Sequence, residues 1–259
     1  STTDIIGDFD ITYVLYCALV TTVAFFGLWI AAKFLIKDKK IVGEFVQAGY
    51  RSSAAILGVA FIQNIYGDSG MAPVMIIGCV PLFNIFAVLV LTFEGEKDGG
   101  KGNIINSLIN IVKNPIIIGI VLGVSASLLK IDFPEIIDKT LASLAKMASP
   151  LALITIGAGF EGRKAIAKIK PTIAATMIKL VVLPAVFLPI AIKLGFRDQA
   201  LVALIIMLGS PTTPSSYIMA KNMGHEGVLT SSVVVATTLM SSLCLTFWIF
   251  VARYFGYII

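Results

Sequence analysis

The sequence predicts an all-α integral membrane protein. Hydrophobic residues make up 58% of the 259 positions and charged residues only 14%, and the mean hydropathy is +0.95. Ordinary soluble domains carry about 25% charged residues, so this balance excludes them. A membrane-spanning helix needs about 20 apolar residues, and the charges of this chain are clustered between runs of that length. Eight spans are predicted, at 11–36, 44–66, 70–93, 114–131, 136–160, 170–194, 198–222 and 227–255.

The first three spans are bounded by charged or turn-forming segments. A Lys-Asp-Lys-Lys cluster at 37–40 follows the first span, and a Tyr-Gly-Asp-Ser-Gly turn at 66–70 ends the second. The third span contains Pro73 and Pro81 and is followed by the longest polar loop, 94–103. This loop is the boundary that we expect between two halves of the chain.

The later spans are delimited in the same way. The fourth opens with an Asn-Pro pair, which is a favoured helix start. The fifth contains Lys146 and ends in the charged segment 161–164, and the sixth contains Lys179. The eighth is rich in Thr and Ser, which in membrane helices most often serve helix packing.

The seventh span contains an unusual polar stretch. Residues 209–216 read Gly-Ser-Pro-Thr-Thr-Pro-Ser-Ser inside an otherwise apolar run. Two prolines three residues apart remove two backbone donors, so a continuous helix is not expected. Many secondary transporters build their substrate site where such half-helices meet near mid-membrane. A proline kink relieved by the neighbouring hydroxyl groups is the alternative explanation.

A weak internal repeat relates this stretch to the second span. A shift of 157 residues places the Gly-Asp-Ser-Gly turn at 67–70 on Gly-His-Glu-Gly at 224–227, and 52–53 on 209–210. Each half then has a polar interruption, a Gly-x-x-Gly turn and a long apolar span. The second span runs outward and the seventh inward, so the repeat is inverted. Inverted repeats with interrupted helices point to a site at the membrane midplane.

Charge asymmetry predicts the orientation. If the loops after the first, third, fifth and seventh spans are cytoplasmic, that side holds 12 of the 20 Lys and Arg residues and the opposite side holds five. The positive-inside rule then places both ends of this chain outside.

Several function classes are disfavoured by the residue types. The acidic residues lie in loops or near span ends, so no span carries the paired carboxylates of an intramembrane enzyme. A single histidine, His225, excludes a multi-histidine metal site, and the three cysteines lie in apolar runs where they pack. The basic residues serve as topology signals, so no nucleic-acid partner is expected. We predict no enzyme, no cofactor and no metal.

Motif-like stretches extend along nearly the whole chain, at 50–58 with 66–67, 113–117, 148–151 with 156–158, 179–184 and 210–221. In this order they resemble the auxin efflux carrier family, which includes plant auxin exporters and bacterial carriers of malonate and related acids. The resemblance implies ten spans in two inverted halves with two broken crossover helices. This chain resembles spans three to ten, without the first two, in a bacterial cytoplasmic membrane.

The resemblance also implies a division of labour along the chain. Residues 11–93 and 170–259 would form the two parts of a mobile transport domain, and 114–160 the remaining scaffold helices. A homodimer through the scaffold helices is a further expectation, and Lys146, on that side, is expected to be structural. Trp29 and Trp248 near span ends fit an interfacial aromatic belt.

The function expected from these features is secondary transport of a small organic anion such as a carboxylate. Half-helix N-termini suit carboxylates, and charges inside spans are site hypotheses by default. Arg51 and Lys179 are such charges, although Arg51 is close enough to its span end to snorkel. Ser53 stands where the family typically has asparagine, so no specific substrate is carried over. The predicted substrate-binding residues are Arg51, Ser52, Ser53, Lys179, Ser210, Pro211, Thr212, Thr213 and Pro214.

Two alternatives remain open: a sodium-coupled symporter similar to the bile-acid carriers, and a membrane sensor or receptor with a carrier-like fold. Proton-coupled carriers commonly use an acid or histidine inside the membrane. This chain places no acid in a span interior, and we expect His225 to be solvated in a cytoplasmic turn. The sequence therefore predicts voltage-driven export of an anion without obligatory proton or sodium coupling.

Overall fold

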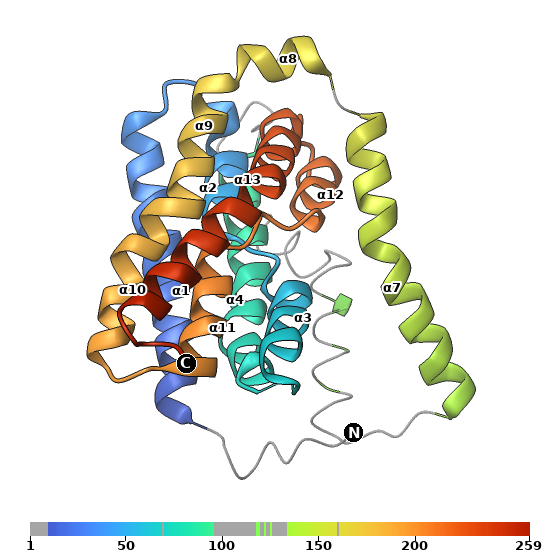
Figure 1. Ribbon diagram of the computed structural model, residues 1–259. Coiled ribbons are helices and arrows are strands. Elements are labelled where there is room, and N and C mark those ends of the chain that lie inside the picture. Colours follow the sequence, from blue (N-terminus) through green and yellow to red (C-terminus); the bar gives the residue numbers. More distant parts are fainter. Residues whose placement is uncertain are drawn as a thin grey trace.

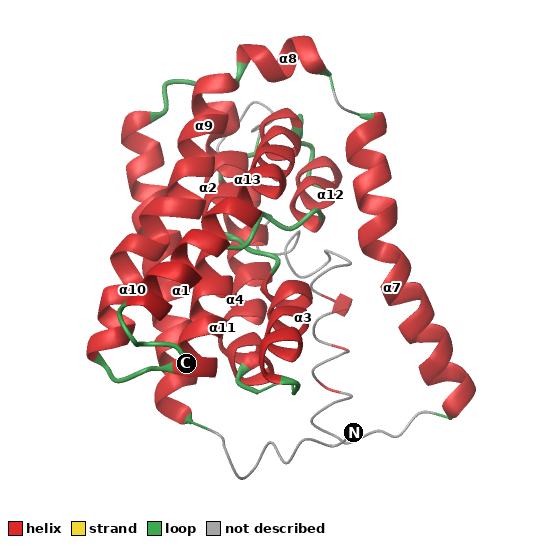
Figure 2. Ribbon diagram, viewed as in Figure 1, coloured by secondary structure: helices red, strands yellow, loops and turns green. Residues whose placement is uncertain are grey.

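The computed structural model describes residues 10–68, 70–95, 134–159 and 161–259, with residues 118, 119, 122 and 125. The regular elements of the described part are all helices, joined by short loops, and none of them is a strand (Figures 1 and 2). Five of its helices are long and apolar enough to cross a membrane. They are α1 (Ile11–Leu35), α4 (Ala72–Phe93), α7 (Glu135–Ala158), the continuous helix 169–193 and α13 (Val228–Tyr254). The prediction of an all-α membrane protein is confirmed.

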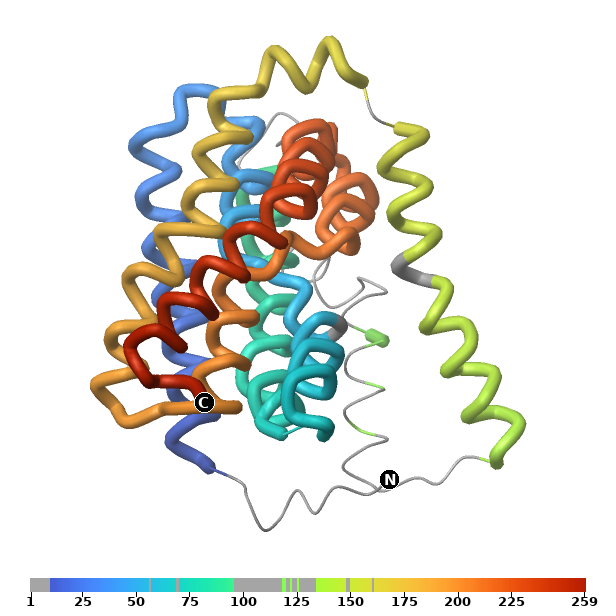
Figure 3. Tube along the Cα trace, viewed as in Figure 1, coloured from blue at the N-terminus to red at the C-terminus, as the bar shows by residue number. Residues whose placement is uncertain are grey.

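Two further spans are each split into a pair of shorter helices, as the sequence predicts (Figure 3). The breaks lie at 51–53 in the second span and at 210–214 in the seventh. The four half-helices are α2 (Val42–Tyr50), α3 (Ala54–Tyr66), α11 (Asp198–Gly209) and α12 (Ser215–Asn222). Short helices η1 (Lys39–Ile41) and α8 (Gly162–Ala167) precede α2 and the sixth span.

The sixth span is continuous but irregular. It consists of α9 (Ile169–Met177), a π-helical turn η2 (Ile178–Val182) and α10 (Leu183–Lys193). Pro184 has no N–H, so the carbonyl of Leu180, four residues earlier, loses its usual partner. The indole Nε1 of Trp248 donates to that carbonyl at 3.0 Å, which fixes α13 to this irregular segment.

The half-helices α2 and α11 form the centre of the molecule. All nine residues of α2 are buried, and residues 201–208 of α11 are at most 3% exposed. A helix that is apolar on every face is stable only when it is surrounded by others, and α11 contacts α3, α4, α10 and α13. The outer helix α1 packs on α4 and α2 and exposes Leu15, Leu19 and Phe34 on its other side, as expected for a lipid-facing helix.

The same order of elements occurs twice. A break leads into a half-helix, then a Gly-x-x-Gly turn, then a long helix: α3 into α4, and α12 into α13. The two broken spans run in opposite directions, with α2 above α3 and α12 above α11 in Figure 1. The turn glycines Gly67, Gly70, Gly224 and Gly227 all have positive φ, which disfavours other residues there. This order supports the inverted repeat that the sequence indicates.

Helix α7 stands apart from the other long helices and contacts α12 (Figure 1). A small apolar cluster joins them, in which Ile156 of α7 packs with Tyr217 of α12 and Val234 of α13. Lys146 is exposed on α7. The predicted fourth span, 114–131, lies almost wholly outside the described residues, so the division into transport domain and scaffold stays a prediction.

Candidate functional site

The two breaks meet and are hydrogen-bonded to each other. The backbone N–H of Ser53 donates to the carbonyl of Pro211 at 2.9 Å. The hydroxyl of Thr212 donates to the carbonyl of Ala48, at the end of α2, at 2.7 Å. Each break thus supplies partners for backbone groups that the other leaves without a helical bond. This satisfies the requirement that irregular backbone at membrane depth be buried in protein or line a cavity.

A small polar cavity opens beside this crossover. Its volume is about 210 Å³. The cavity lies at the first residues of α3 and α12, and the N-cap residues Ser53 and Pro214 form no side-chain cap hydrogen bond in the described structure. Their backbone N–H groups carry partial positive charge. The residues that line the cavity are Arg51, Ser52, Ser53, Ala55, Val80, Phe83, Asn84, Thr213 and Ser215.

Arg51 is the charged group of the cavity. Its side chain is 5% exposed, so it does not snorkel to the membrane surface. One terminal nitrogen, Nη2, donates to Asn84 Oδ1 at 2.5 Å and to Ser215 Oγ at 3.1 Å. The other, Nη1, donates to the sulfur of Met219 at 3.5 Å. All three partners are neutral, and within the described residues Arg51 forms no ion pair.

Lys179 is fully buried, but it lies at the C-terminus of α11 and not at the cavity of Arg51. Its Nζ donates to the carbonyl of Leu208 at 2.5 Å and lies 3.4 Å from that of Met207. The hydroxyl of Ser52 also donates to Met207 O, at 2.7 Å. These carbonyls end α11, where the helix carries partial negative charge and lacks internal donors. Lys179 therefore holds the C-terminus of α11 and is not among the lining residues of the cavity.

The other predicted residues surround the crossover without all facing the cavity. Thr213 lines it, and its hydroxyl lies 3.2 Å from that of Ser215. The backbone N–H of Thr212 donates to Thr237 of α13 at 3.1 Å. Ser210 is fully buried, and its hydroxyl has no hydrogen-bond partner within the described residues. Pro211 and Pro214 form the break itself and do not line the cavity.

Two polar residues of the cavity are missing from the predicted set. Ser215 directly follows the predicted stretch. Asn84 lies on α4, where it is a polar side chain within the apolar run 72–93 and follows Pro81 by three residues. A polar side chain within an apolar span is the feature of the sequence that could have indicated a site residue here. The structure places the Asn84 amide in the same cavity as Ser53.

Two titratable residues at the end of the molecule that carries α8 are more buried than the sequence suggests. We expected His225 to be solvated, which is wrong: it is 8% exposed, and its Nε2 lies 2.9 Å from the carbonyl of Leu91. Glu44 is 1% exposed, and its carboxylate accepts from the N–H groups of Gly227 and Thr230 at 2.9 Å each, and from the Thr230 hydroxyl at 3.0 Å. Neither residue lines the cavity.

A family model described as "Membrane transport protein" matches residues 1–249. The chain belongs to this family, the auxin efflux carriers. Its role is therefore membrane transport. In this carrier, the hydrogen-bonded crossover and the Arg51 cavity are the candidate substrate site.

Curated relatives agree with the family. The carrier is 23% identical to a "Putative malonate transporter" of Rhizobium meliloti, over 90% of this chain and 75% of that relative. It is 24% identical to an "Uncharacterized transporter YfdV" of Escherichia coli, over 76% of this chain. The chain spans 64% of the length of the second relative.

Proposed function

We propose that this chain carries the substrate site of a secondary transporter for a small organic anion such as a carboxylate. The observation that carries the proposal is Arg51, a buried cation whose described partners are all neutral. An uncompensated charge within a membrane is costly, and an anionic substrate would supply the missing counter-charge. The starts of α3 and α12 at the same cavity add partial positive charge.

The chemistry of the cavity supports a compact, polar substrate. At about 210 Å³ the cavity is smaller than the 300–1,000 Å³ typical of sites for drug-sized ligands. A carboxylate is a planar acceptor that the guanidinium fork of Arg51 can bind with two parallel hydrogen bonds. The hydroxyl groups of Ser53, Thr213 and Ser215 are further donors. Malonate, which the name of one relative specifies, fits this description.

The proposed mechanism is alternating access around the crossover. The substrate anion binds at Arg51, and access then changes from one side of the membrane to the other. Specificity would come from hydroxyl groups and the Asn84 amide, since these side chains donate and accept in fixed places.

The test uses the complete carrier reconstituted into vesicles, with labelled malonate and other small carboxylates as probes. Arg51→Gln removes the charge, and Arg51→Lys keeps it but loses the fork. We expect Arg51→Gln to weaken anion affinity by roughly ten- to a hundredfold, because hydrogen bonds to charged groups contribute about 1.5–3 kcal/mol. Arg51→Lys should lie between. Lys146→Gln, which changes an exposed lysine of α7, is the control.

Two of the following outcomes would contradict the proposal, and sodium dependence would add ion coupling to it. Unchanged anion affinity in Arg51→Gln would remove Arg51 from the site. Uptake that collapses when sodium is removed would favour the sodium-coupled symporter. Binding without any flux in vesicles would favour a sensor or receptor.

A further inference from the structure

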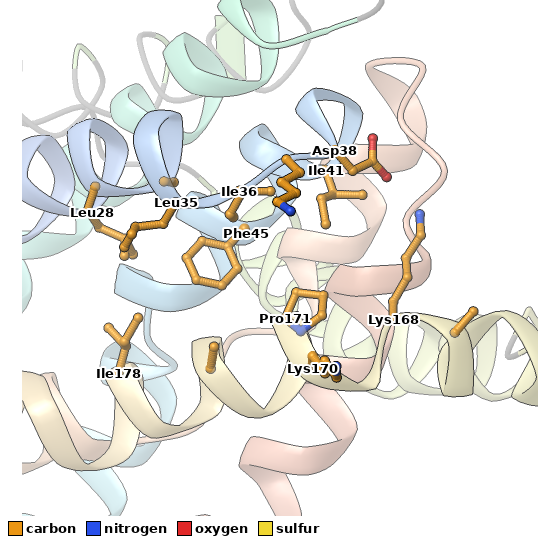
Figure 4. A pocket seen from close by; sticks show the side chains of 15 residues that line it. Leu28, Leu35, Ile36, Asp38, Ile41, Phe45, Lys168, Lys170, Pro171 and Ile178 are labelled. Carbon is orange, nitrogen blue, oxygen red and sulfur yellow. The ribbon is translucent and has the colours of Figure 1, made fainter.

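A groove lies away from the crossover, between the end of α1 and the start of α9. Its volume is about 510 Å³. Figure 4 shows Leu35 and Phe45 facing Pro171 and Ile178 across it. Ala31, Ala167 and Ala174 also line the groove, and their small side chains leave it open.

The mouth of this groove is basic. Lys37, Lys168 and Lys170 line it, against one acid, Asp38. The Asp38 carboxylate already accepts from the backbone N–H of Lys40, at the start of η1. Lys168 is paired with Glu226 at 2.6 Å, and this hydrogen bond lowers the pKa of the Glu226 carboxyl below its usual value. Within the described residues, Lys37 and Lys170 form no ion pair.

The depth of the groove follows from the helices that form it. Leu28 lies seven residues before Leu35 on α1, and Ile178 lies eight residues after Lys170 in the sixth span. At 1.5 Å per residue, the apolar walls extend about 10–12 Å inward from the basic mouth. Lysines at the membrane surface with an apolar slot beneath them match the two parts of a phospholipid, a charged headgroup and an acyl chain.

We propose that this groove binds one anionic phospholipid, with its phosphate between Lys37 and Lys170 and an acyl chain along Phe45. The mouth carries the basic cluster that the positive-inside rule assigns to the cytoplasm, where anionic lipids attract basic segments. Basic pockets between membrane helices on that side are known to accept such headgroups. The site is separate from the cavity at Arg51 and does not depend on which substrate the carrier moves.

The test is lipid retention by the complete carrier in detergent, measured by native mass spectrometry. The probes are phosphatidylglycerol and phosphatidylcholine with the same acyl chains. We expect one tightly retained phosphatidylglycerol, and a loss of affinity of roughly tenfold or more in the double variant Lys37→Gln/Lys170→Gln, since each surface lysine contributes about 1 kcal/mol. Ala174→Phe, which fills the groove, should displace the same lipid.

The matched control is Lys139→Gln/Lys146→Gln, which removes two lysines of α7 and should retain the lipid. Equal melting temperatures in lipid-free detergent show that each variant folds. Unchanged phosphatidylglycerol affinity in both groove variants would overturn the proposal. Equal retention of phosphatidylcholine would also overturn it, as would no retained lipid at all, the result expected if another segment of the carrier fills the groove.

Discussion

At the crossover, Arg51 lies near the N-termini of two half-helices, whereas Lys179 lies at the C-terminus of another. Arg51 lies at the cavity with the starts of α3 and α12, while Lys179 donates to the last carbonyls of α11. A cation at a helix C-terminus compensates partial negative charge. At the starts of α3 and α12, Arg51 instead adds to partial positive charge. The first arrangement stabilises the fold, and the second leaves an excess of positive charge for a ligand.

Substitution of Lys179 separates these two roles. Lys179→Met keeps the length of the side chain but removes the donor, leaving buried carbonyls of Met207 and Leu208 without it. We expect a stability loss of about 1–3 kcal/mol, measured as a lower melting temperature in detergent, with a smaller effect on anion affinity than Arg51→Gln. Lys146→Met is the control. A large loss of affinity at an unchanged melting temperature would return Lys179 to the substrate site, as the sequence suggests.

At the scale of elements, α2 and α13 are joined at their starts by Glu44. Its carboxylate binds the Gly227 and Thr230 N–H groups, which are among the first donors of α13 and have no partner within that helix. A buried acid thus acts as the cap of a helix from the other half of the chain. It fixes α13 against the centre of the molecule.

Replacing Glu44 tests this connection. Glu44→Gln keeps the size of the side chain, but its amide nitrogen cannot accept, so at least one of three hydrogen bonds is lost. We expect a stability loss of about 1–3 kcal/mol, seen in thermal unfolding. Glu135→Gln is the matched control, because Glu135 is 79% exposed and pairs with Lys139 at the surface. If both variants melt alike, Glu44 is not a structural link.

At the scale of the whole molecule, the charged groups are divided between the crossover and the membrane surfaces. Among the described residues that line the cavity, Arg51 is charged and none is an acid. Two buried titratable groups, Glu44 and His225, lie at one end, bound to the backbone of α13 and to Leu91. A third, Lys179, is bound to the last carbonyls of α11. Neither Glu44 nor His225 lines the cavity, and uncoupled anion export stays a prediction.

Flux of a fully ionised substrate under a clamped voltage tests this driving force. One elementary charge gains about 2.3 kcal/mol per 100 mV, so a monovalent anion should reach a concentration ratio of roughly fiftyfold at that voltage. The measurement uses vesicles with the complete carrier, potassium and an ionophore. Accumulation driven by a pH gradient alone at zero voltage would show proton coupling and end this proposal.

Local chemistry predicts the breaks, and long-range packing decides what surrounds them. Both interruptions can be located from the sequence, at the prolines 211 and 214 and at the polar group 51–53. These residues disturb the helix only within a few residues of their own position. Asn84 reaches the cavity only because α4 packs on α3 and α11. Lys179 acts on α11, which comes nearly 30 residues later in the chain. No local pattern encodes such contacts.

The burial of the turn at His225 could not be predicted from the sequence, because it also depends on contacts with distant segments. His225 lies in a turn that begins and ends with glycine, at 224–227, and such turns usually lie at the surface. The sequence therefore suggests a solvated histidine. In the structure the loop is enclosed by α2 and the end of α4: the ring lies 3.2 Å from where a Cβ of Gly43 would be. A Cβ at Gly43 would be in tight contact with the imidazole, so the glycine at this position helps the ring to fit.

The hydrogen bond from Ser53 to Pro211 limits how this carrier can move. Pulling the two breaks apart would leave the Ser53 N–H and the Pro211 carbonyl without the hydrogen bond that joins them, which is costly at membrane depth. We therefore expect the crossover to stay whole, with Arg51 fixed inside it, while the remaining helices shift around it. A bound anion would then cross the membrane together with the intact crossover. It would not pass through a gap that opens between the two breaks.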